Sequence, residues 1–264
     1  MIDIAQGQVR LEKHGAVAHL ILDRPSKINA MSVVMDRQMN SLIFDINNDS
    51  DIRSVLLYGL GERGFCAGSD ITDLDEYGDN WQYRNRFAAG LDYARAVWLI
   101  RKPVIAAIHG WCIGGGLEMA CGADLRIAAP DAKFAAGEIR HGWHGGSGQT
   151  QFLTHQIGPG NAAKFLLVGE PIDAESSLRM GLIQDIVEQD SLLESAQALA
   201  ESIAEKAPVA AQMTKHMIRM AQSVPLEVGL LYENDSFAYC MNTEDAAEGR
   251  RAFAEKRRPE FKGR

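Results

Sequence analysis

Two glycine-rich segments of the chain have the composition of backbone anion-binding sites. Residues 64–71 read GFCAGSDI and residues 109–120 read HGWCIGGGLEMA, and a short apolar run that predicts a buried strand precedes each. Glycine lets a backbone amide approach a ligand closely, so each segment can present an unobstructed N–H donor. In the second segment a helix-forming sequence follows the glycines, and its dipole adds positive charge where the amides point. Either segment alone could be a plain strand-to-helix connection, but two converging donors would form an oxyanion hole.

Glu118 is the acidic residue best placed for chemistry beside such donors. It follows three consecutive glycines at the start of an apolar helical sequence. Most glutamates are solvated surface charges, and this position suits that role least. A carboxyl group here could act as a general acid or base on a bound ligand.

A dinucleotide-binding motif is considered and rejected. Residues 59–64 read GLGERG, which matches G-x-G-x-x-G after a predicted strand, and Asp79 lies twenty residues beyond its start. That fingerprint requires glycines that open a helix, whose N-terminus receives the pyrophosphate. The following residues, FCAGS, contain no helix start, so we predict a flexible turn.

Two further motifs are considered and rejected as catalytic or metal sites, and pocket lining is the preferred role of the histidine pair. His141 and His144 form an H-x-x-H pair, but no third ligand stands at helical spacing in this glycine-rich loop, which argues against zinc. Ser147 lies in Gly-Gly-Ser-Gly-Gln and lacks the strand-elbow-helix context of a serine hydrolase. No metal site is therefore predicted.

Alternating strands and helices are predicted around these segments, and then helices alone. Strands are expected at residues 16–22, 54–58, 104–108 and 125–128, and helices at 33–46, 87–100 and 116–122. From about residue 190 four helical stretches follow, with Pro208 and Pro225 at helix starts. We predict an α/β core over residues 1–195 and an all-helical part over 196–264 that folds back on the core or grips a neighbouring subunit.

Composition indicates a folded, acidic protein. The 264 residues carry a formal net charge of −8, which opposes binding to nucleic acid or to an anionic membrane. No window reaches the roughly 18 uninterrupted apolar residues that a membrane helix needs, and the charged start is unlike a signal peptide. We therefore expect a cytoplasmic location, with an organellar location after a processing step as the alternative. The four cysteines contain no CxxC pair and are expected to be buried thiols.

The order and spacing of several segments resemble the crotonase, or enoyl-CoA hydratase/isomerase, superfamily along nearly the whole chain. Besides the two glycine-rich segments, the resemblance rests on residues 23–30 (DRPSKINA), 102–107 (KPVIAA), 132–134 (AKF) leading to Glu138, 171–174 (PIDA) and 252–257 (AFAEKR). It implies a crotonase-like spiral of ββα units with an all-helical C-terminal region. It also implies a homotrimer, commonly a dimer of trimers.

The resemblance also implies which residues act. At the matching positions, the amides of Ser69 and Gly115 would be the two oxyanion donors, and Glu118 and Glu138 the two catalytic glutamates. Relatives with both glutamates are typically hydratases, whereas isomerases often retain one. We therefore predict addition of water across the double bond of a 2-enoyl-CoA thioester. Glu118 would chiefly orient and activate the water and Glu138 would transfer the proton at the α-carbon, with sharing of both tasks as the alternative.

This reaction needs no cofactor, since coenzyme A is part of the substrate. The alternatives are an enoyl-CoA isomerase with the same oxyanion hole and an inactive crotonase-fold scaffold. Thioester hydrolysis and dehalogenation on the same fold usually recruit a differently placed acidic residue.

Residues that would bind coenzyme A are implied by the same resemblance. Lys27 and Lys256 match positions that approach the CoA phosphates, with Phe253 of a neighbouring subunit beside them. The basic end around Lys256 could instead be a solvated tail. Thr72 stands where some relatives carry another phosphate-facing lysine. The remaining predicted CoA-binding positions are Ile28, Ala67, Asp70 and Ile71.

The loop over residues 137–150 departs from the family pattern. Relatives usually have proline where Gly137 stands and again near Gly145 or Gly146. The additional glycine loosens the loop around Glu138. Trp143 and His144 are expected to alter the acyl pocket, which favours an unusual substrate.

Overall fold

A computed structural model describes residues 6–72 and 92–264 of the chain. Within this part the main sheet has six strands in the order β1, β2, β3, β4, β6, β9. Its antiparallel edge strand β1 (Gln8–His14) pairs with β2 (Val17–Asp23), and the other neighbours are parallel. The inner strands are β3 (Ser54–Gly59), β4 (Val104–Ile108) and β6 (Leu125–Ala128), and β9 (Asp185–Ile186) ends the sheet.

A small second sheet gives the fold its repeating step. It consists of β5 (Trp111–Ile113), β7 (Lys133–Ala135) and β8 (Ile172–Asp173), and an isolated bridge joins Cys66 to Cys112 beside it. The chain leaves β4 in the main sheet, enters β5 in the small sheet and then forms helix α4 (Gly115–Gly122). Because the step from β6 to β7 repeats this move, the arrangement is the spiral of ββα units that the family resemblance implies.

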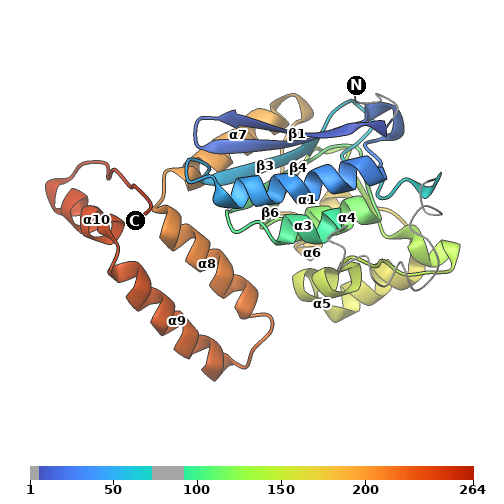
Figure 1. Cartoon of the computed structure of the whole chain (residues 1–264). Helices are drawn as coiled ribbons and strands as arrows, with labels where there is room; N and C mark the ends of the chain where they lie inside the picture. Colours follow the sequence, from blue (N-terminus) through green and yellow to red (C-terminus); the bar gives the residue numbers. More distant parts are fainter. Residues whose placement is uncertain (1–5, 73–91) are drawn as a thin grey trace.

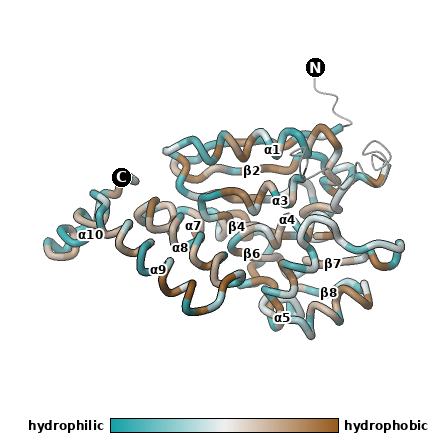
Figure 2. Tube along the Cα trace, turned by 60° about the horizontal axis from the view of Figure 1, so that its bottom comes forward, coloured by the Kyte–Doolittle hydropathy of each residue, from teal (hydrophilic) through white to brown (hydrophobic). Residues whose placement is uncertain are grey.

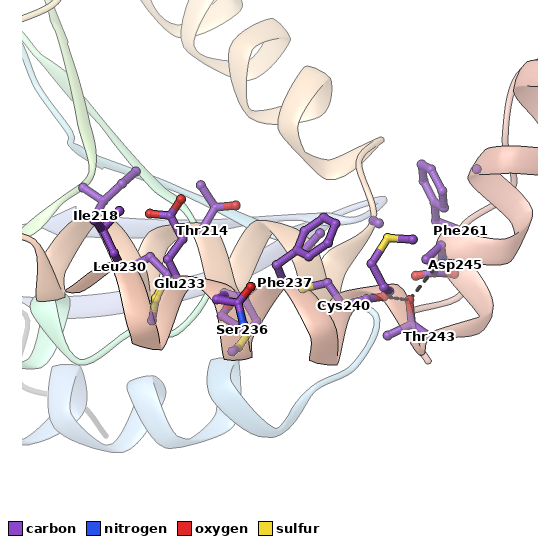
Figure 3. Close-up of a pocket in the computed structure, with 18 of the residues that line it drawn as sticks. Thr214, Ile218, Leu230, Glu233, Ser236, Phe237, Cys240, Thr243, Asp245 and Phe261 are labelled. Carbon is purple, nitrogen blue, oxygen red and sulfur yellow. Dashed lines mark hydrogen bonds between the residues drawn. The ribbon is translucent and has the colours of Figure 1, made fainter. Parts of the chain in front are cut away.

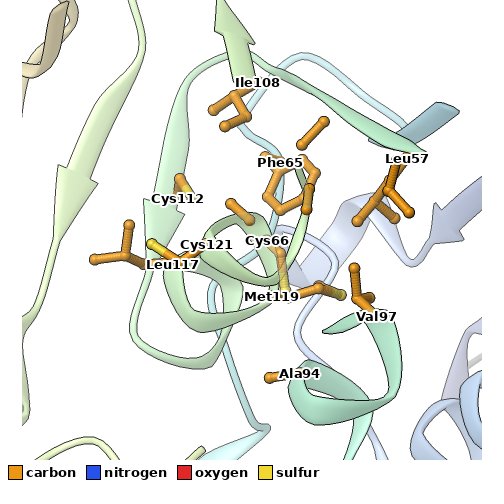
Figure 4. Close-up of a cluster of buried hydrophobic side chains, with 14 of the residues drawn as sticks. Leu57, Phe65, Cys66, Ala94, Val97, Ile108, Cys112, Leu117, Met119 and Cys121 are labelled. Atoms are coloured by element: carbon orange, nitrogen blue, oxygen red, sulfur yellow. The ribbon is translucent and has the colours of Figure 1, made fainter. Parts of the chain in front are cut away.

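Helices cover both faces of the main sheet (Figure 1), and apolar side chains pack in the two layers between them. Helices α1 (Val33–Asn48), α3 (Tyr93–Trp98) and α4 cover one face, and α7 (Leu192–Ala204) covers the other. The strands are accordingly continuous apolar runs rather than alternating patterns. Figure 4 shows how α3 and α4 pack around one cluster, which includes Leu57, Phe65, Val97, Ile108, Leu117 and Met119.

Helix α5 (Gln149–Val168) is kinked where its sequence requires it. Gly158 has φ +76° and Pro159 follows inside the helix. Proline cannot donate an intrahelical hydrogen bond, so the two residues together interrupt the helix. Helix α6 (Ala174–Met180) then leads back to β9. Asp173 caps its first turn, because its side chain accepts a hydrogen bond from the Ser176 amide.

The C-terminal helices α8 (Pro208–Met220), α9 (Leu226–Met241) and α10 (Glu244–Glu255) extend away from the sheet (Figures 1 and 2). Lys215 ties α8 to the core, because its Nζ lies 2.6 Å from Asp124 Oδ2 and 2.6 Å from the Lys102 carbonyl. Between α8 and α9 lies a largely apolar hollow of about 890 Å³, which Figure 3 shows lined by Ile218, Leu230 and Phe237. Part of the apolar surface of these helices is thus left uncovered by this chain.

Most sequence-based elements are confirmed. The strands at 104–108 and 125–128 have the predicted bounds, and Pro208 and Pro225 stand at the starts of α8 and α9. Residues 60–69 form no helix, which confirms the rejection of a dinucleotide fingerprint. Residues 87–91 of the helix predicted at 87–100 lie outside the described residues, and strand β1 was not predicted.

Three of the four predicted buried thiols, Cys66, Cys112 and Cys121, are buried, whereas Cys240 is half-buried. No helix in the described part of the chain is both long and apolar enough to span a bilayer.

Candidate active site

The three glycines that begin α4 each leave room for a different neighbour. A Cβ on Gly114 would lie 2.9 Å from Glu138 Oε1, and one on Gly115 only 1.8 Å from the Tyr93 hydroxyl. A Cβ on Gly116 would lie 2.2 Å from the carbonyl oxygen of Cys66. Gly114 also has φ +55°, which side chains rarely tolerate. The glycine run therefore lets the first turn of α4 contact three other segments at once.

The two glycine-rich segments meet at this turn. A Cβ on Gly68 would lie 2.9 Å from the Gly115 nitrogen, so the backbone before Ser69 is in contact with the start of α4. Neither the Ser69 nor the Gly115 amide donates a hydrogen bond to another group among residues 6–72 and 92–264. The structure therefore brings the two predicted oxyanion donors together with both N–H groups available to a ligand.

Glu118 projects from the same turn into a buried environment. Its side chain is 4% exposed, and Oε1 accepts a hydrogen bond of 2.9 Å from the Ser147 amide. Burial raises the pKa of Glu118 to about 7. The Ser147 amide opposes that rise, while the negative charges of Glu138 and Asp92 add to it. A carboxyl group with this pKa can lose and accept a proton near neutral pH.

Glu138 lies beside Glu118 on the 3-10 helix η4 (Gly137–His141). Its Oε1 accepts a hydrogen bond of 3.0 Å from Gln149 Nε2, at the start of α5. Its Oε2 is buried and has no hydrogen-bond partner among the described residues. The loop over residues 137–150, which departs from the family pattern, therefore still places Glu138 beside Glu118. Oε2 of Glu138 is left available to a ligand.

Most of the predicted CoA-binding positions near residue 28 form one edge of the site. The Ala67 amide donates to the Ile28 carbonyl at 2.9 Å, and Lys27 is exposed at the end of the 3-10 helix η2 (Pro25–Lys27). Ile28 has φ +51°, an uncommon conformation for a β-branched residue.

Asp70 and Ile71 lie at the same edge of the site, but Asp70 is buried and Ile71 is exposed. Asp70 is 5% exposed, and its carboxylate pairs with Arg24 at 2.7 Å. It also accepts hydrogen bonds from the Thr72 amide and hydroxyl. The Asp70 side chain is thus engaged in holding the loop, and its amide donates to the Met31 carbonyl at 2.9 Å.

The other predicted contacts lie on separate elements. Phe253 is exposed on α10 and Lys256 ends that helix, far from α4 in the single chain (Figure 1). Trp143 is half-exposed and stacks on His141. His144 is exposed and lines a cavity of about 300 Å³ together with Gln149. Its other lining is mainly apolar and includes Ala136, Ile139, Pro159 and Leu166.

Four residues of the site were not assigned from the sequence. Ser147 and Gln149 hold the two glutamates, and Asp92 and Tyr93 approach α4 from α3. No local pattern marks them, because their partners are distant along the chain. Within the described residues, no group of three or more histidine, cysteine or acidic side chains is arranged to hold a metal ion.

Comparisons with known proteins agree with this geometry. A sequence model of the enoyl-CoA hydratase/isomerase family matches residues 12–264. The short-chain-enoyl-CoA hydratase of Clostridium acetobutylicum is 37% identical over 257 residues, which cover 97% of this chain and 98% of that protein. The (E)-benzylidenesuccinyl-CoA hydratase of Thauera aromatica is also 37% identical over 257 residues, with 97% and 99% covered. A crystal structure of enoyl-CoA hydratase from Bacillus anthracis matches with a TM-score of 0.91 at 32% identity, covering 97% of this chain and 99% of that one.

The chain therefore belongs to the enoyl-CoA hydratase/isomerase family. Its crotonase-type α/β fold with C-terminal helices is confirmed by the solved structure. It is accordingly an enzyme of the enoyl-CoA hydratase kind, as the sequence predicts.

Proposed function

We propose that the chain hydrates a short 2-enoyl-CoA with Glu118 and Glu138 as its acid-base pair and the amides of Ser69 and Gly115 as its oxyanion hole. The observation that carries the proposal is the juxtaposition of the buried Glu118 carboxyl group and the half-buried Glu138 carboxyl group with two unoccupied amide donors near the first turn of α4. The helix dipole favours negative charge at the same point. A thioester oxygen bound there would be polarised next to both carboxyl groups.

The chemistry divides between the two glutamates. Ionised Glu118 takes a proton from water as the water oxygen bonds to the β-carbon, and electrons move through the α-carbon onto the thioester oxygen. The two amides stabilise that enolate. Glu138 then delivers a proton to the α-carbon as the carbonyl reforms, so the double bond is consumed and the thioester is retained. A proton passes back from Glu118 to Glu138 before the next turnover. No cofactor takes part in these steps.

Membership of the family does not determine which acyl group the substrate carries. One relative is named for short-chain enoyl-CoA and another for (E)-benzylidenesuccinyl-CoA. In this chain the cavity of about 300 Å³ beside Gln149 is small and mainly apolar. The cavity meets the site through Gln149, which donates a hydrogen bond to Glu138, and we propose that it receives a short acyl chain.

A substrate screen tests the proposed function. The purified protein is incubated with a series of trans-2-enoyl-CoA thioesters of increasing length and with a 3-enoyl-CoA, and hydration is followed by loss of the ultraviolet absorbance of the conjugated thioester. Turnover should be greatest for the short 2-enoyl-CoA. Isomerisation of the 3-enoyl-CoA without hydration of any 2-enoyl-CoA would replace the proposal by an isomerase, and inactivity toward all of them would favour a binding scaffold.

Asp92→Asn is expected to move the acid limb of the kcat/KM profile to lower pH. Asp92 Oδ1 caps α3 by accepting from the Arg95 amide at 2.9 Å, a bond that asparagine preserves. The substitution removes a negative charge that raises the pKa of Glu118, so Glu118 loses its proton at lower pH. In the parent, activity should rise with pH through about 7 as Glu118 becomes the base. Identical pH profiles for parent and variant would exclude this influence of Asp92.

The C-terminal helices support a trimer or a dimer of trimers. Leu226, Leu230, Leu231 and Phe237 are between 55% and 72% exposed in the single chain. Contiguous apolar surface of this kind commonly marks an interface, and closed symmetry is the usual form of homo-oligomers. We expect light scattering at micromolar concentration to give the mass of three or six chains, and Leu231→Glu to weaken the assembly. A monomeric parent protein would contradict the proposal.

A further inference from the structure

Tyr93 occupies the point where the two proposed oxyanion segments meet. It is the first residue of α3, and its large side chain is 2% exposed. Its hydroxyl lies 2.9 Å from Ser69 Oγ. The same hydroxyl lies 1.8 Å from the position that a Cβ on Gly115 would take. One phenol therefore contacts both residues whose amides form the proposed hole.

The contact with Gly115 explains why that position has no side chain. The ring carbons Cζ and Cε2 of Tyr93 lie 2.8 and 3.2 Å from the same Cβ position, so the phenol fills the space beside the glycine. The contact with Ser69 is polar and not steric. A buried tyrosine hydroxyl normally forms a hydrogen bond, because leaving it unsatisfied is costly. Tyr93 thus packs against Gly115 in one glycine-rich segment and forms a hydrogen bond with Ser69 in the other.

We propose that Tyr93 is a positioning residue of the oxyanion hole, which fixes the spacing of the Ser69 and Gly115 amides through its hydrogen bond to Ser69 Oγ and its packing on Gly115. The inference rests on the proposed hydratase function. Oxyanion donors are effective only when they are held at hydrogen-bond distance from the oxygen on which charge develops. Backbone hydrogen bonds already join the two segments, because the Cys66 amide donates to the Trp111 carbonyl at 3.1 Å and the Ile113 amide donates to the Cys66 carbonyl at 2.9 Å. Tyr93 adds a side-chain contact at the two donor residues themselves.

Two variants that remove one oxygen each test the proposal. Tyr93→Phe keeps the ring that packs on Gly115, and Ser69→Ala keeps the Ser69 amide, but both lose the hydrogen bond. We expect each to lower kcat for a short 2-enoyl-CoA by roughly 10- to 100-fold with little change in KM, as for small misplacements of catalytic groups. Because both changes remove the same bond, the double variant should be no slower than the slower single variant.

The carbonyl stretching frequency of bound butyryl-CoA separates positioning from a general structural role. This saturated thioester cannot be hydrated, so its carbonyl reports only the strength of the hydrogen bonds that it accepts. The parent protein should shift the band to lower frequency, and both variants should lose part of that shift. Tyr58→Phe is the matched control, because Tyr58 is also buried but lies on β3 among the residues that pack against α7. It should leave the band and kcat unchanged.

The outcomes distinguish this inference from the proposed function. An active parent whose Tyr93→Phe and Ser69→Ala variants keep the parent kcat and the parent carbonyl band would overturn the role of Tyr93. Additive losses in the double variant would also overturn it, because they would show that the two hydroxyl groups act separately. A parent protein that hydrates no enoyl-CoA would instead remove the function on which the inference rests.

Discussion

Glu118→Gln is expected to lower kcat for hydration of a short 2-enoyl-CoA by at least about a hundredfold, the usual loss when a general acid or base is removed. The fold should survive, because the glutamine Oε1 can still accept the hydrogen bond that the Ser147 amide donates to Glu118 at 2.9 Å. Glutamine cannot take a proton from water. Steady-state kinetics and a thermal unfolding curve of the same preparation measure both expectations.

The stability of this variant has a predictable dependence on pH. Burial raises the folded-state pKa of Glu118 to about 7, above the ordinary value of 4.5 that describes the unfolded chain. A carboxyl group with a raised folded pKa contributes stability at low pH and loses it as pH rises between those two values. Relative to Glu118→Gln, the parent should therefore become less stable as pH increases from about 4.5 to above 7. Activity loss together with retained stability at pH 8 would indicate lost chemistry rather than lost structure.

Glu138→Gln should cause a comparable loss of kcat. Glu138 Oε2 accepts no hydrogen bond from any described residue, so this oxygen is available to the substrate. Glu175→Gln provides the matched control, because Glu175 is an exposed residue of α6. Near-parent turnover by either active-site variant would remove that glutamate from the mechanism. A loss of activity in Glu175→Gln would show that the assay reports something other than the site.

The local chemistry of the sequence accounts for the inner strands and for the glycine turn. Strands β3 and β4 are continuous apolar runs, and the three glycines before Glu118 are unusual enough to identify the site. Strand β1 was missed because it is an edge strand with polar residues such as Arg10, Glu12 and Lys13 on it. An edge strand pairs on one side only and needs few buried side chains.

The remaining site residues depend on contacts that sequence periodicity does not encode. Tyr93 meets Ser69 across 24 positions of the chain, and Ser147 meets Glu118 across 29. The glycine loop before α5 was predicted to loosen the placement of Glu138. In the structure, Gln149 at the start of α5 donates a hydrogen bond to Glu138 Oε1 at 3.0 Å. This contact appears only once the fold has brought the two residues together.

The second large effect is expected at Gly115, which contributes a backbone donor and no side chain. In Gly115→Val the new Cβ would lie 1.8 Å from the Tyr93 hydroxyl and 2.8 Å from its Cζ, so the start of α4 must shift. The shift would move the amide away from the thioester oxygen while both glutamates remain. We expect kcat to fall by roughly two to three orders of magnitude, because the donor acts on charge that develops in the transition state.

A pair of alanine variants shows whether the collision with Tyr93 causes that loss. Gly115→Ala introduces the same Cβ, and adding Tyr93→Phe removes the oxygen at 1.8 Å but leaves Cζ at 2.8 Å. The double variant should therefore recover part of the thermal stability lost in Gly115→Ala, without exceeding the kcat of Tyr93→Phe alone. Gly160→Ala is the control, since a Cβ there meets nothing within 4 Å. If Gly115→Val folds, binds coenzyme A and turns over at the parent rate, the turn before α4 is only a connection and the oxyanion hole lies elsewhere.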